Sequence, residues 1–139
     1  MNIYFSCSIT GGRKDENIYQ RIVNYLIENG HEVPTAHLAS PDVMKDEFDL
    51  NAVDVYKRDM EWVRNCDALI AEVSTPSHGV GYEIAAGIFL GKHVMCCYQK
   101  DKNISKIISG NSNENVYVFA YKGEKELIYE IEKFIKGIS

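Results

Sequence analysis

Hydrophobic residues recur along this chain with two different spacings. Short apolar runs predict buried strands at 2–6, 31–35, 67–73, 94–98 and 116–120. Between most of these runs, apolar residues three and four positions apart predict helices at 15–28, 52–65, 80–90 and 124–135, with a short helical turn at 104–108. The polar segment 38–49 contains Pro41 and four acids, so we expect a surface loop there.

This alternation of strands and helices determines the expected fold. Parallel neighbouring strands need a crossover connection, which is usually a helix. The chain is therefore predicted to form one α/β domain over residues 1–139, a doubly wound, flavodoxin-like fold with a five-stranded parallel sheet. Ligands of such sheets bind beyond the carboxyl ends of the strands. We therefore look for chemistry in the loops after the first, third and fourth predicted strands.

Length and composition are those of an ordinary soluble domain. The chain has 139 residues, of which 45% are hydrophobic and 25% charged. A net charge of -5 argues against polymeric nucleic acid as a partner, because its recognition depends on Lys and Arg. No apolar run approaches the roughly 18 residues of a membrane helix, and the chain opens on a predicted strand. We expect a cytoplasmic protein with no membrane partner.

The four cysteines and four histidines do not show the spacing of a metal site. Cys96 and Cys97 lie inside an apolar run, where buried free thiols are the ordinary expectation. We therefore expect neither a metal ion nor another cofactor.

The loop after the third predicted strand, residues 76–83, reads Pro-Ser-His-Gly-Val-Gly-Tyr-Glu. Its hydroxyl and glycine residues stand where a strand gives way to a helix N-terminus, whose N–H groups and dipole favour an anion. A plain turn with a helix cap would show the same local pattern. The chain contains no GxxxxGK[ST] motif, so the sequence does not support ATP chemistry.

Two acids stand near this loop. Glu83, in the first turn or so of the predicted helix, could stabilise the helix dipole or could be an ionised nucleophile directed at a sugar. Asp59, on the preceding helix, would ordinarily face solvent. Two carboxylates that reach one cleft are the usual means of cleaving glycosidic bonds. The residues alone leave both interpretations open.

The first loop, residues 4–13, ends a strand with hydroxyl residues and paired glycines, which let a backbone approach a ligand closely. It lacks the GxGxxG pattern of dinucleotide-binding folds. Tyr4 would ordinarily fill the core, and only a partner carboxylate would make its hydroxyl functional. His37 and Arg13 would ordinarily be surface residues.

Taken together, these segments resemble the 2′-deoxynucleoside 5′-phosphate N-hydrolases of the nucleoside 2-deoxyribosyltransferase superfamily. The resemblance runs from Ile3 to about Ser109. It rests on Tyr4-Phe5-x-x-Ser8-Ile9-x-Gly11-Gly12-Arg13, Asp59-Met60-Glu61-Trp62, Ala71-Glu72-Val73 and Pro76-Ser77-x-Gly79-Val80-Gly81-Tyr82-Glu83. The combination of the first and last motifs is specific, whereas either motif alone would not be.

The resemblance implies hydrolysis of 2′-deoxynucleoside 5′-monophosphates to free base and 2-deoxyribose 5-phosphate. Glu83 matches the family's nucleophile, which attacks the anomeric carbon and forms a deoxyribosyl ester. Asp59 matches a second carboxylate that contacts the sugar and assists proton transfer. Tyr4 matches a tyrosine whose hydroxyl positions this machinery.

The resemblance also implies a set of binding residues. Ser77 and Gly79 match the phosphate-binding turn. Ser105 matches a serine that reaches the phosphate from the neighbouring subunit, so the family works as a homodimer with shared sites. The other positions expected to contact the deoxynucleotide are Ser8, Ile9, Thr10, Gly11, Arg13 and His37, among which Ile9, Gly11 and His37 match residues lining the sugar and base pocket.

The chain departs from the family pattern in the first loop. Thr10 stands where the better-known animal members have an arginine near the phosphate, and Cys7 replaces a glycine. Loss of a charge-assisted donor could weaken selectivity for the 5′-phosphate. Residues 6–10 could still bind the anion through N–H and hydroxyl groups.

Two alternative functions remain open. A nucleoside 2-deoxyribosyltransferase would share Glu83 but pass the sugar to a second base, and Ser77 with Ser105 favours the hydrolase because both match phosphate contacts. A non-catalytic nucleotide-sensing module could use the same fold. The set of Tyr4, Asp59 and Glu83 argues against a sensor, because a protein that only binds needs no carboxylate beside the sugar.

Overall fold

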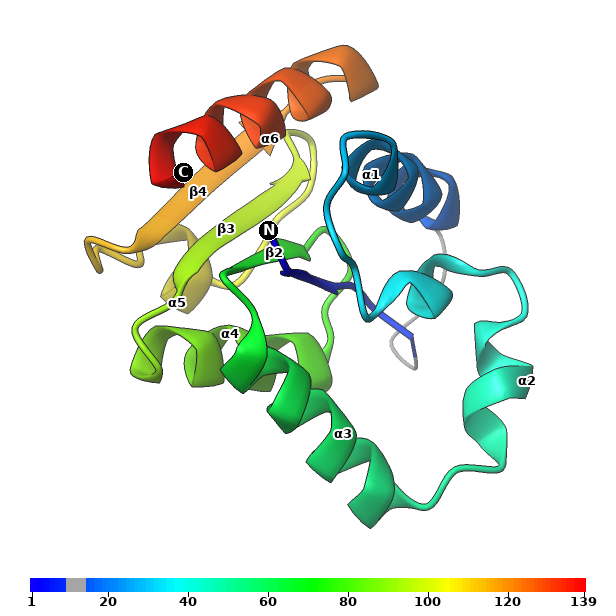
Figure 1. Ribbon diagram of the computed structural model, residues 1–139. Coiled ribbons are helices and arrows are strands. Elements are labelled where there is room, and N and C mark those ends of the chain that lie inside the picture. Colours follow the sequence, from blue (N-terminus) through cyan, green and yellow to red (C-terminus); the bar gives the residue numbers. More distant parts are fainter. Residues whose placement is uncertain (10–14) are drawn as a thin grey trace.

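The computed structural model of the protein describes residues 1–9 and 15–139. Within these residues, four parallel strands form one sheet in the order β1-β2-β3-β4 (Figure 1). The strands are β1 (Ile3–Ser6), β2 (Ala68–Glu72), β3 (His93–Gln99) and β4 (Val116–Tyr121). Every residue of β1 and β2 is buried, as expected for strands covered on both faces. The predicted α/β class with a parallel sheet is confirmed, but the sheet of the described residues has four strands and not the five that were predicted.

Helices cover both faces of the sheet. In Figure 1, α1 (Glu16–Glu28) and α6 (Glu124–Ile138) lie above it, and α3 (Ala52–Asn65) and α4 (His78–Phe89) lie below. A short helix, α5 (Lys106–Ser109), follows β3. Strand side chains alternate between the two layers, so that Ile3 and Phe5 join the core under α1 and α6. Tyr4, between them, joins the core under α3 and α4.

The predicted strand at 31–35 is wrong, and this segment makes a single parallel bridge between Asn2 and Glu32. In the register of that bridge, the next hydrogen bond would require an N–H from Pro34, which proline lacks. The N–H of Phe5 instead donates to Oγ1 of Thr35 at 3.0 Å. A side chain thus replaces the backbone of a fifth strand at this edge of the sheet.

The loop predicted at 38–49 is also wrong, because this segment contains the end of the 3-10 helix η1 (Ala36–Ala39) and the whole of the helix α2 (Val43–Phe48). Leu38, Ala39 and Val43 are buried in the core beneath α1 and α6. These few apolar anchors order a stretch whose overall composition is polar. No helix in the described part of the chain is both long enough and apolar enough to span a membrane.

Candidate active site

The side chain of Glu83 comes from α4, which begins immediately after the turn that follows β2. Oγ of Ser77 accepts a hydrogen bond from the N–H of Val80 at 3.4 Å and caps the helix. The helix therefore begins at His78, two residues earlier than predicted, and Glu83 lies in its second turn. The free N–H groups of the first turn are therefore not what holds this carboxyl group.

Two hydroxyl groups of β1 hold Glu83. The Tyr4 hydroxyl donates a hydrogen bond to Oε1 at 2.9 Å, and the Ser6 hydroxyl donates one to Oε2. Side chains two positions apart on a strand point to the same face, so both hydroxyls face α4. Ser6 was predicted only as one of residues 6–10 that could bind the anion, and strand alternation from Tyr4 was the available signal for its contact with Glu83.

Burial is the largest influence on the pKa values of Glu83 and Tyr4. Burial, assisted by the negative charge of Asp59, raises the pKa of Glu83 to about 7 against the opposing hydrogen bonds of Ser6 and Tyr4. Both protonation states of Glu83 are therefore populated near neutral pH, rather than the fully ionised form expected from the sequence. Burial and the charge of Glu83 also raise the pKa of Tyr4 far above its ordinary value, so its phenol stays a donor.

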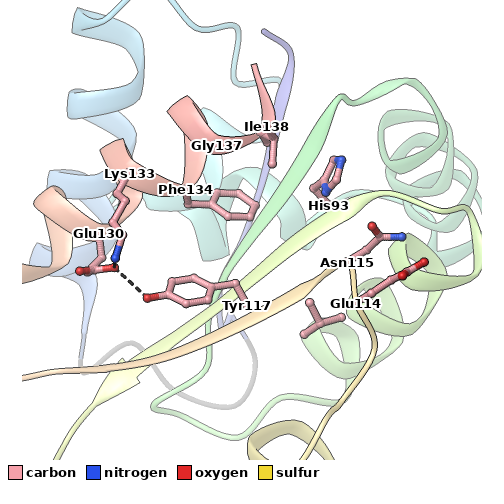
Figure 2. A pocket seen from close by; sticks show the side chains of 10 residues that line it. His93, Glu114, Asn115, Tyr117, Glu130, Lys133, Phe134, Gly137 and Ile138 are labelled. Carbon is pink, nitrogen blue, oxygen red and sulfur yellow. Dashed lines mark hydrogen bonds and ion pairs between the residues drawn. The ribbon is translucent and has the colours of Figure 1, made fainter.

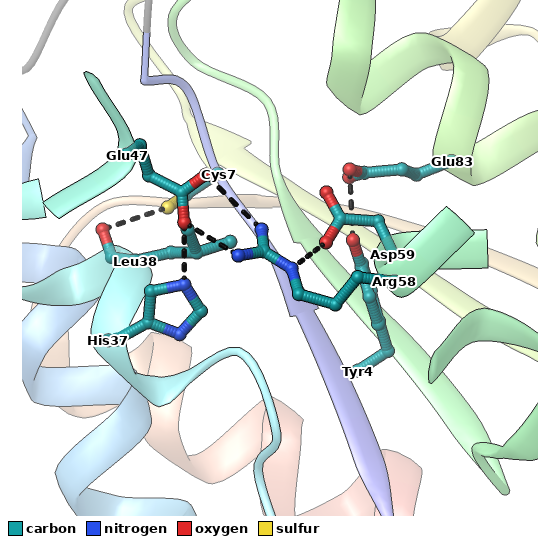
Figure 3. Close-up of polar contacts among 8 residues, drawn as sticks. All are labelled: Tyr4, Cys7, His37, Leu38, Glu47, Arg58, Asp59 and Glu83. Atoms are coloured by element: carbon teal, nitrogen blue, oxygen red, sulfur yellow. Dashed lines mark hydrogen bonds and ion pairs between the residues drawn. The ribbon is translucent and has the colours of Figure 1, made fainter. Parts of the chain in front are cut away.

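Asp59 is held by its neighbour on α3. Figure 3 shows the Arg58 guanidinium between two carboxylates, with Nε donating to Oδ1 of Asp59 at 2.8 Å. Its Nη1 and Nη2 donate to the two oxygens of Glu47 at 3.0 and 3.2 Å. Nε2 of His37 lies 2.8 Å from Oε1 of Glu47. A row of four ionisable groups thus connects α2 and η1 with α3.

The pKa values of the two carboxyl groups in this row shift in opposite directions. Burial raises the pKa of Asp59, and the Arg58 hydrogen bond opposes that rise. Burial would also raise the pKa of Glu47, but its contacts with Arg58 and His37 outweigh burial and lower it. The guanidinium carbon of Arg58 lies 4.8 Å from the Trp62 ring centroid, a cation–π distance. The centroids of the His37 and Trp62 rings are 5.9 Å apart in an edge contact.

Ser77 and Ser105, two of the three predicted phosphate residues, line one cavity of about 550 Å3, whereas Gly79 and Glu83 are not among its lining residues. Ser77 immediately precedes α4, and Ser105 immediately precedes α5. A Cβ atom added to Gly79 would meet only Oγ of Ser77, at 3.9 Å, and one added to Gly81 would meet nothing within 4 Å. The glycines therefore leave open space on this part of α4.

The remaining predicted contacts come from the first loop. Ser8 is buried, and Ile9 packs against the core beneath α1 and α6. The predictions for Thr10, Gly11 and Arg13 fall outside the described residues.

A second cavity, of about 320 Å3, lies at the opposite edge of the sheet, beside the amino ends of β3 and β4 (Figure 2). The Tyr117 hydroxyl donates to Oε2 of Glu130 at 2.8 Å, and Nζ of Lys133 lies 3.6 Å from the same oxygen. Burial, with this hydrogen bond, raises the pKa of Tyr117 to about 12. Three polar groups of this cavity, those of Tyr117, Glu130 and Lys133, therefore contact one another, and Glu83 does not line it.

Comparison with known proteins shows the family of the chain. Residues 3–134 match the family model described as nucleoside 2-deoxyribosyltransferase. The chain belongs to this family.

Relatives within the nucleoside 2-deoxyribosyltransferase family cover nearly the whole chain. A protein from Methanococcoides burtonii, provisionally named 2′-deoxynucleoside 5′-phosphate N-hydrolase 1, is 40% identical over 85% of this chain and 97% of its own. The 5-hydroxymethyl-dUMP N-hydrolase of Esox lucius is 36% identical over 100% of this chain and 99% of its own. The solved structure of Clostridium botulinum CMP N-glycosidase covers 96% of this chain and 99% of its own with a TM-score of 0.71, and at 21% identity it shows the shared fold.

For this member of the family, the structure brings together Tyr4, Asp59 and Glu83, which lie far apart in the sequence. It adds Ser6 beside Glu83 and Arg58 beside Asp59. His37 lies at the far end of the Arg58 row, in contact with Glu47. The roles that the resemblance implies for these residues stay predictions.

Proposed function

We propose that this protein hydrolyses the N-glycosidic bond of 2′-deoxynucleoside 5′-monophosphates and releases the free base and 2-deoxyribose 5-phosphate. The observation that carries the proposal is a partly buried carboxyl group, Glu83, whose two oxygens are held by two hydroxyls where β1 ends. A second acid, Asp59, lies near enough to raise its pKa. The names of the relatives support the substrate class.

The chemistry proceeds in two balanced steps. The ionised Glu83 attacks C1′, the C1′–N bond breaks, and its electron pair leaves with the base, which takes up a proton. Deoxyribose lacks an electron-withdrawing 2′-hydroxyl, and a positioned carboxylate stabilises the oxocarbenium-like transition state. Water then attacks C1′, the bond from C1′ to the Glu83 oxygen breaks, and the water loses a proton. We assign proton transfer in both steps to Asp59, whose pKa burial raises.

We assign the 5′-phosphate to the cavity that Ser77 and Ser105 line. A homodimer in which Ser105 acts on the neighbouring subunit's nucleotide is part of this proposal. Ile107, two residues from Ser105, is 81% exposed, and a second copy would bury that apolar surface. Sedimentation velocity tests the dimer. The Ser105→Ala variant should weaken binding of a nucleotide more than binding of a nucleoside, and equal losses would contradict the assignment.

We also propose a cytoplasmic location. Cys66, Cys96 and Cys97 are free and buried. Unpaired cysteines are typical of reducing compartments.

The test is a substrate panel. Wild-type protein and the Glu83→Gln variant are incubated with deoxynucleoside monophosphates, deoxynucleosides and ribonucleoside monophosphates, and the released base is measured by chromatography. We expect release from the deoxynucleotides and a loss of at least about a thousandfold in the variant, the scale typical of removing a nucleophile. Base exchange that outpaces sugar release on addition of a second base would indicate a transferase. Binding without base release would indicate a sensor.

A further inference from the structure

We propose that Ser6 is a positioning residue for the nucleophile, holding Oε2 of Glu83 while Tyr4 holds Oε1, so that the carboxylate has a single orientation toward C1′. This inference rests on the proposed function, because an orientation matters for catalysis only if Glu83 attacks the sugar. The sequence motif that carries the family resemblance does not include residue 6.

The position of Ser6 follows from the strand. It is the last residue of β1, where it pairs with Ala71 of β2, and it is completely buried. Phe5 points into the opposite core, so the side chains of Tyr4 and Ser6 project from the same face. Two hydroxyls from one short strand therefore meet one carboxyl group from α4.

The pairing restricts the motion of Glu83. A carboxylate with one donor can still rotate about its terminal C–C bond, whereas a donor on each oxygen opposes that rotation. Each oxygen retains a further lone pair, so the two hydrogen bonds leave Glu83 able to form a bond to carbon. A buried hydroxyl that donates to a carboxylate also makes a stronger hydrogen bond than one that donates to a neutral acceptor.

The charges around Glu83 give this contact a measurable signature. Among the described residues, the leading polar and charged groups that act on it are Tyr4 and Ser6 from β1 and Asp59 and Arg58 from α3. Burial raises the pKa of Glu83 to about 7, and the Ser6 hydrogen bond is the leading contribution that opposes burial. Removal of the Ser6 hydroxyl should therefore raise this pKa further and reduce the ionised fraction near neutral pH.

The first experiment compares the pH dependence of kcat/KM for Ser6→Ala and wild type. A charge-assisted hydrogen bond corresponds to about one pKa unit, so the acid limb of the variant should move up by about one unit. The loss of kcat/KM should then be about tenfold larger at pH 6 than at pH 9, and the loss that remains at pH 9, where Glu83 is ionised in both proteins, reports the lost orientation. Cys96→Ala is the matched control, because Cys96 is a fully buried strand residue in the core on the same face of the sheet as Tyr4. The acid limb of the pH profile of this variant should not move.

The second experiment requires no turnover. Carbon-13 NMR follows the titration of the Glu83 carboxyl, identified by its absence from the Glu83→Gln spectrum, and its pKa should rise in Ser6→Ala. Ser6→Cys keeps nearly the same shape with a weak donor, so it should show the same rise even if the alanine variant fails to fold.

An unchanged Glu83 pKa in folded Ser6 variants, or a loss of kcat/KM that is equal at every pH, would overturn the proposal for Ser6. Failure of the wild-type protein to release any base would instead overturn the proposed function. The NMR titration still decides whether Ser6 acts on Glu83 in that case, so the two failures are distinguishable.

Discussion

A carboxylate that leaves water loses its hydration, and Glu83 recovers part of that loss from the hydroxyls of Tyr4 and Ser6. The balance leaves its pKa at about 7, where a side chain can be ionised for attack and can also exist as the neutral acid. Tyr4 remains protonated beside it, because burial and the charge of Glu83 both raise the pKa of the phenol. At this scale, the reactivity of the site depends on how much water reaches one carboxyl group.

The pH profile of the wild-type enzyme should report this balance. We expect kcat/KM to fall about tenfold for each unit below about pH 7, because only ionised Glu83 attacks. The substrate phosphate also titrates near pH 6, so the profile should be repeated with a 5′-phosphate monomethyl ester, whose charge is constant. An acid limb below about pH 5.5 with both substrates would contradict the assignment of this pKa to Glu83.

Among the elements, α2 and α3 are joined through Arg58. Its guanidinium connects Glu47 of α2 to Asp59 of α3, and both carboxyl side chains are only 14% exposed. Arg58 is itself 25% exposed, so solvent screens these ion pairs only in part. The helix α2, which was not predicted because its composition is polar, therefore helps to hold Asp59 through Arg58.

The Arg58→Met variant should test this link, with Arg64→Met as its control on the exposed last turn of the same helix. Loss of Arg58 leaves Glu47 and Asp59 without their shared cation, so we expect a loss of about 2 kcal/mol in the free energy of unfolding. We also expect kcat to fall about tenfold or more as Asp59 loses its orientation. Urea denaturation and initial rates measure the two effects.

Arg64→Met should stay within about 0.5 kcal/mol of wild type in unfolding free energy, as is typical of exposed substitutions. Wild-type kcat in folded Arg58→Met would show that Asp59 does not depend on this link.

Across the whole molecule, a second buried acid joins several strand ends. Glu72, the last residue of β2, is fully buried and accepts hydrogen bonds from the hydroxyls of Ser74 and Tyr121, the latter at 3.0 Å. Oγ of Ser74 in turn accepts from the N–H of Gln99 at 2.8 Å, and Nε2 of Gln99 donates to Asp15 at 2.6 Å. Burial raises the pKa of Glu72 to about 7 despite these donors.

The stability of the folded protein should therefore decrease from pH 5 to pH 8. A carboxyl group whose pKa is higher in the folded state binds a proton there that the unfolded chain has already lost, so ionisation between about pH 4.5 and 7 disfavours folding. For Glu72 alone, the upper bound is about 3 kcal/mol. Urea denaturation at pH 5.5, 6.5 and 8 measures the trend, and stability that rises over this range would contradict it.

Glu83→Gln offers a matched comparison for this trend. It removes the second raised carboxyl group, while the two hydroxyls can reorient to pair with an amide. The variant should therefore show a shallower loss of stability with rising pH than wild type.

Most of the fold could be predicted from local pattern. The helix at 52–65 was predicted with its observed bounds, because its apolar spacing is regular and the Asn51 side chain caps it by accepting from the N–H of Val53 at 2.8 Å. The strand at 31–35 was wrong because hydrophobic pattern does not show which N–H groups a sheet edge needs, and Pro34 lacks the one required.

The sequence by itself determined the parallel α/β architecture and, through the resemblance, the candidate carboxylates Glu83 and Asp59 with Tyr4. Apolar periodicity and short motifs involve residues that are close together in the chain, so they can be recognised in the sequence without a structure. Only the tertiary structure brought Ser6 to Glu83, and Glu47 with Arg58 to Asp59. Such contacts, and the burial that raises the pKa of Glu83 to about 7, depend on distances between separate elements, which exist only after the chain has folded.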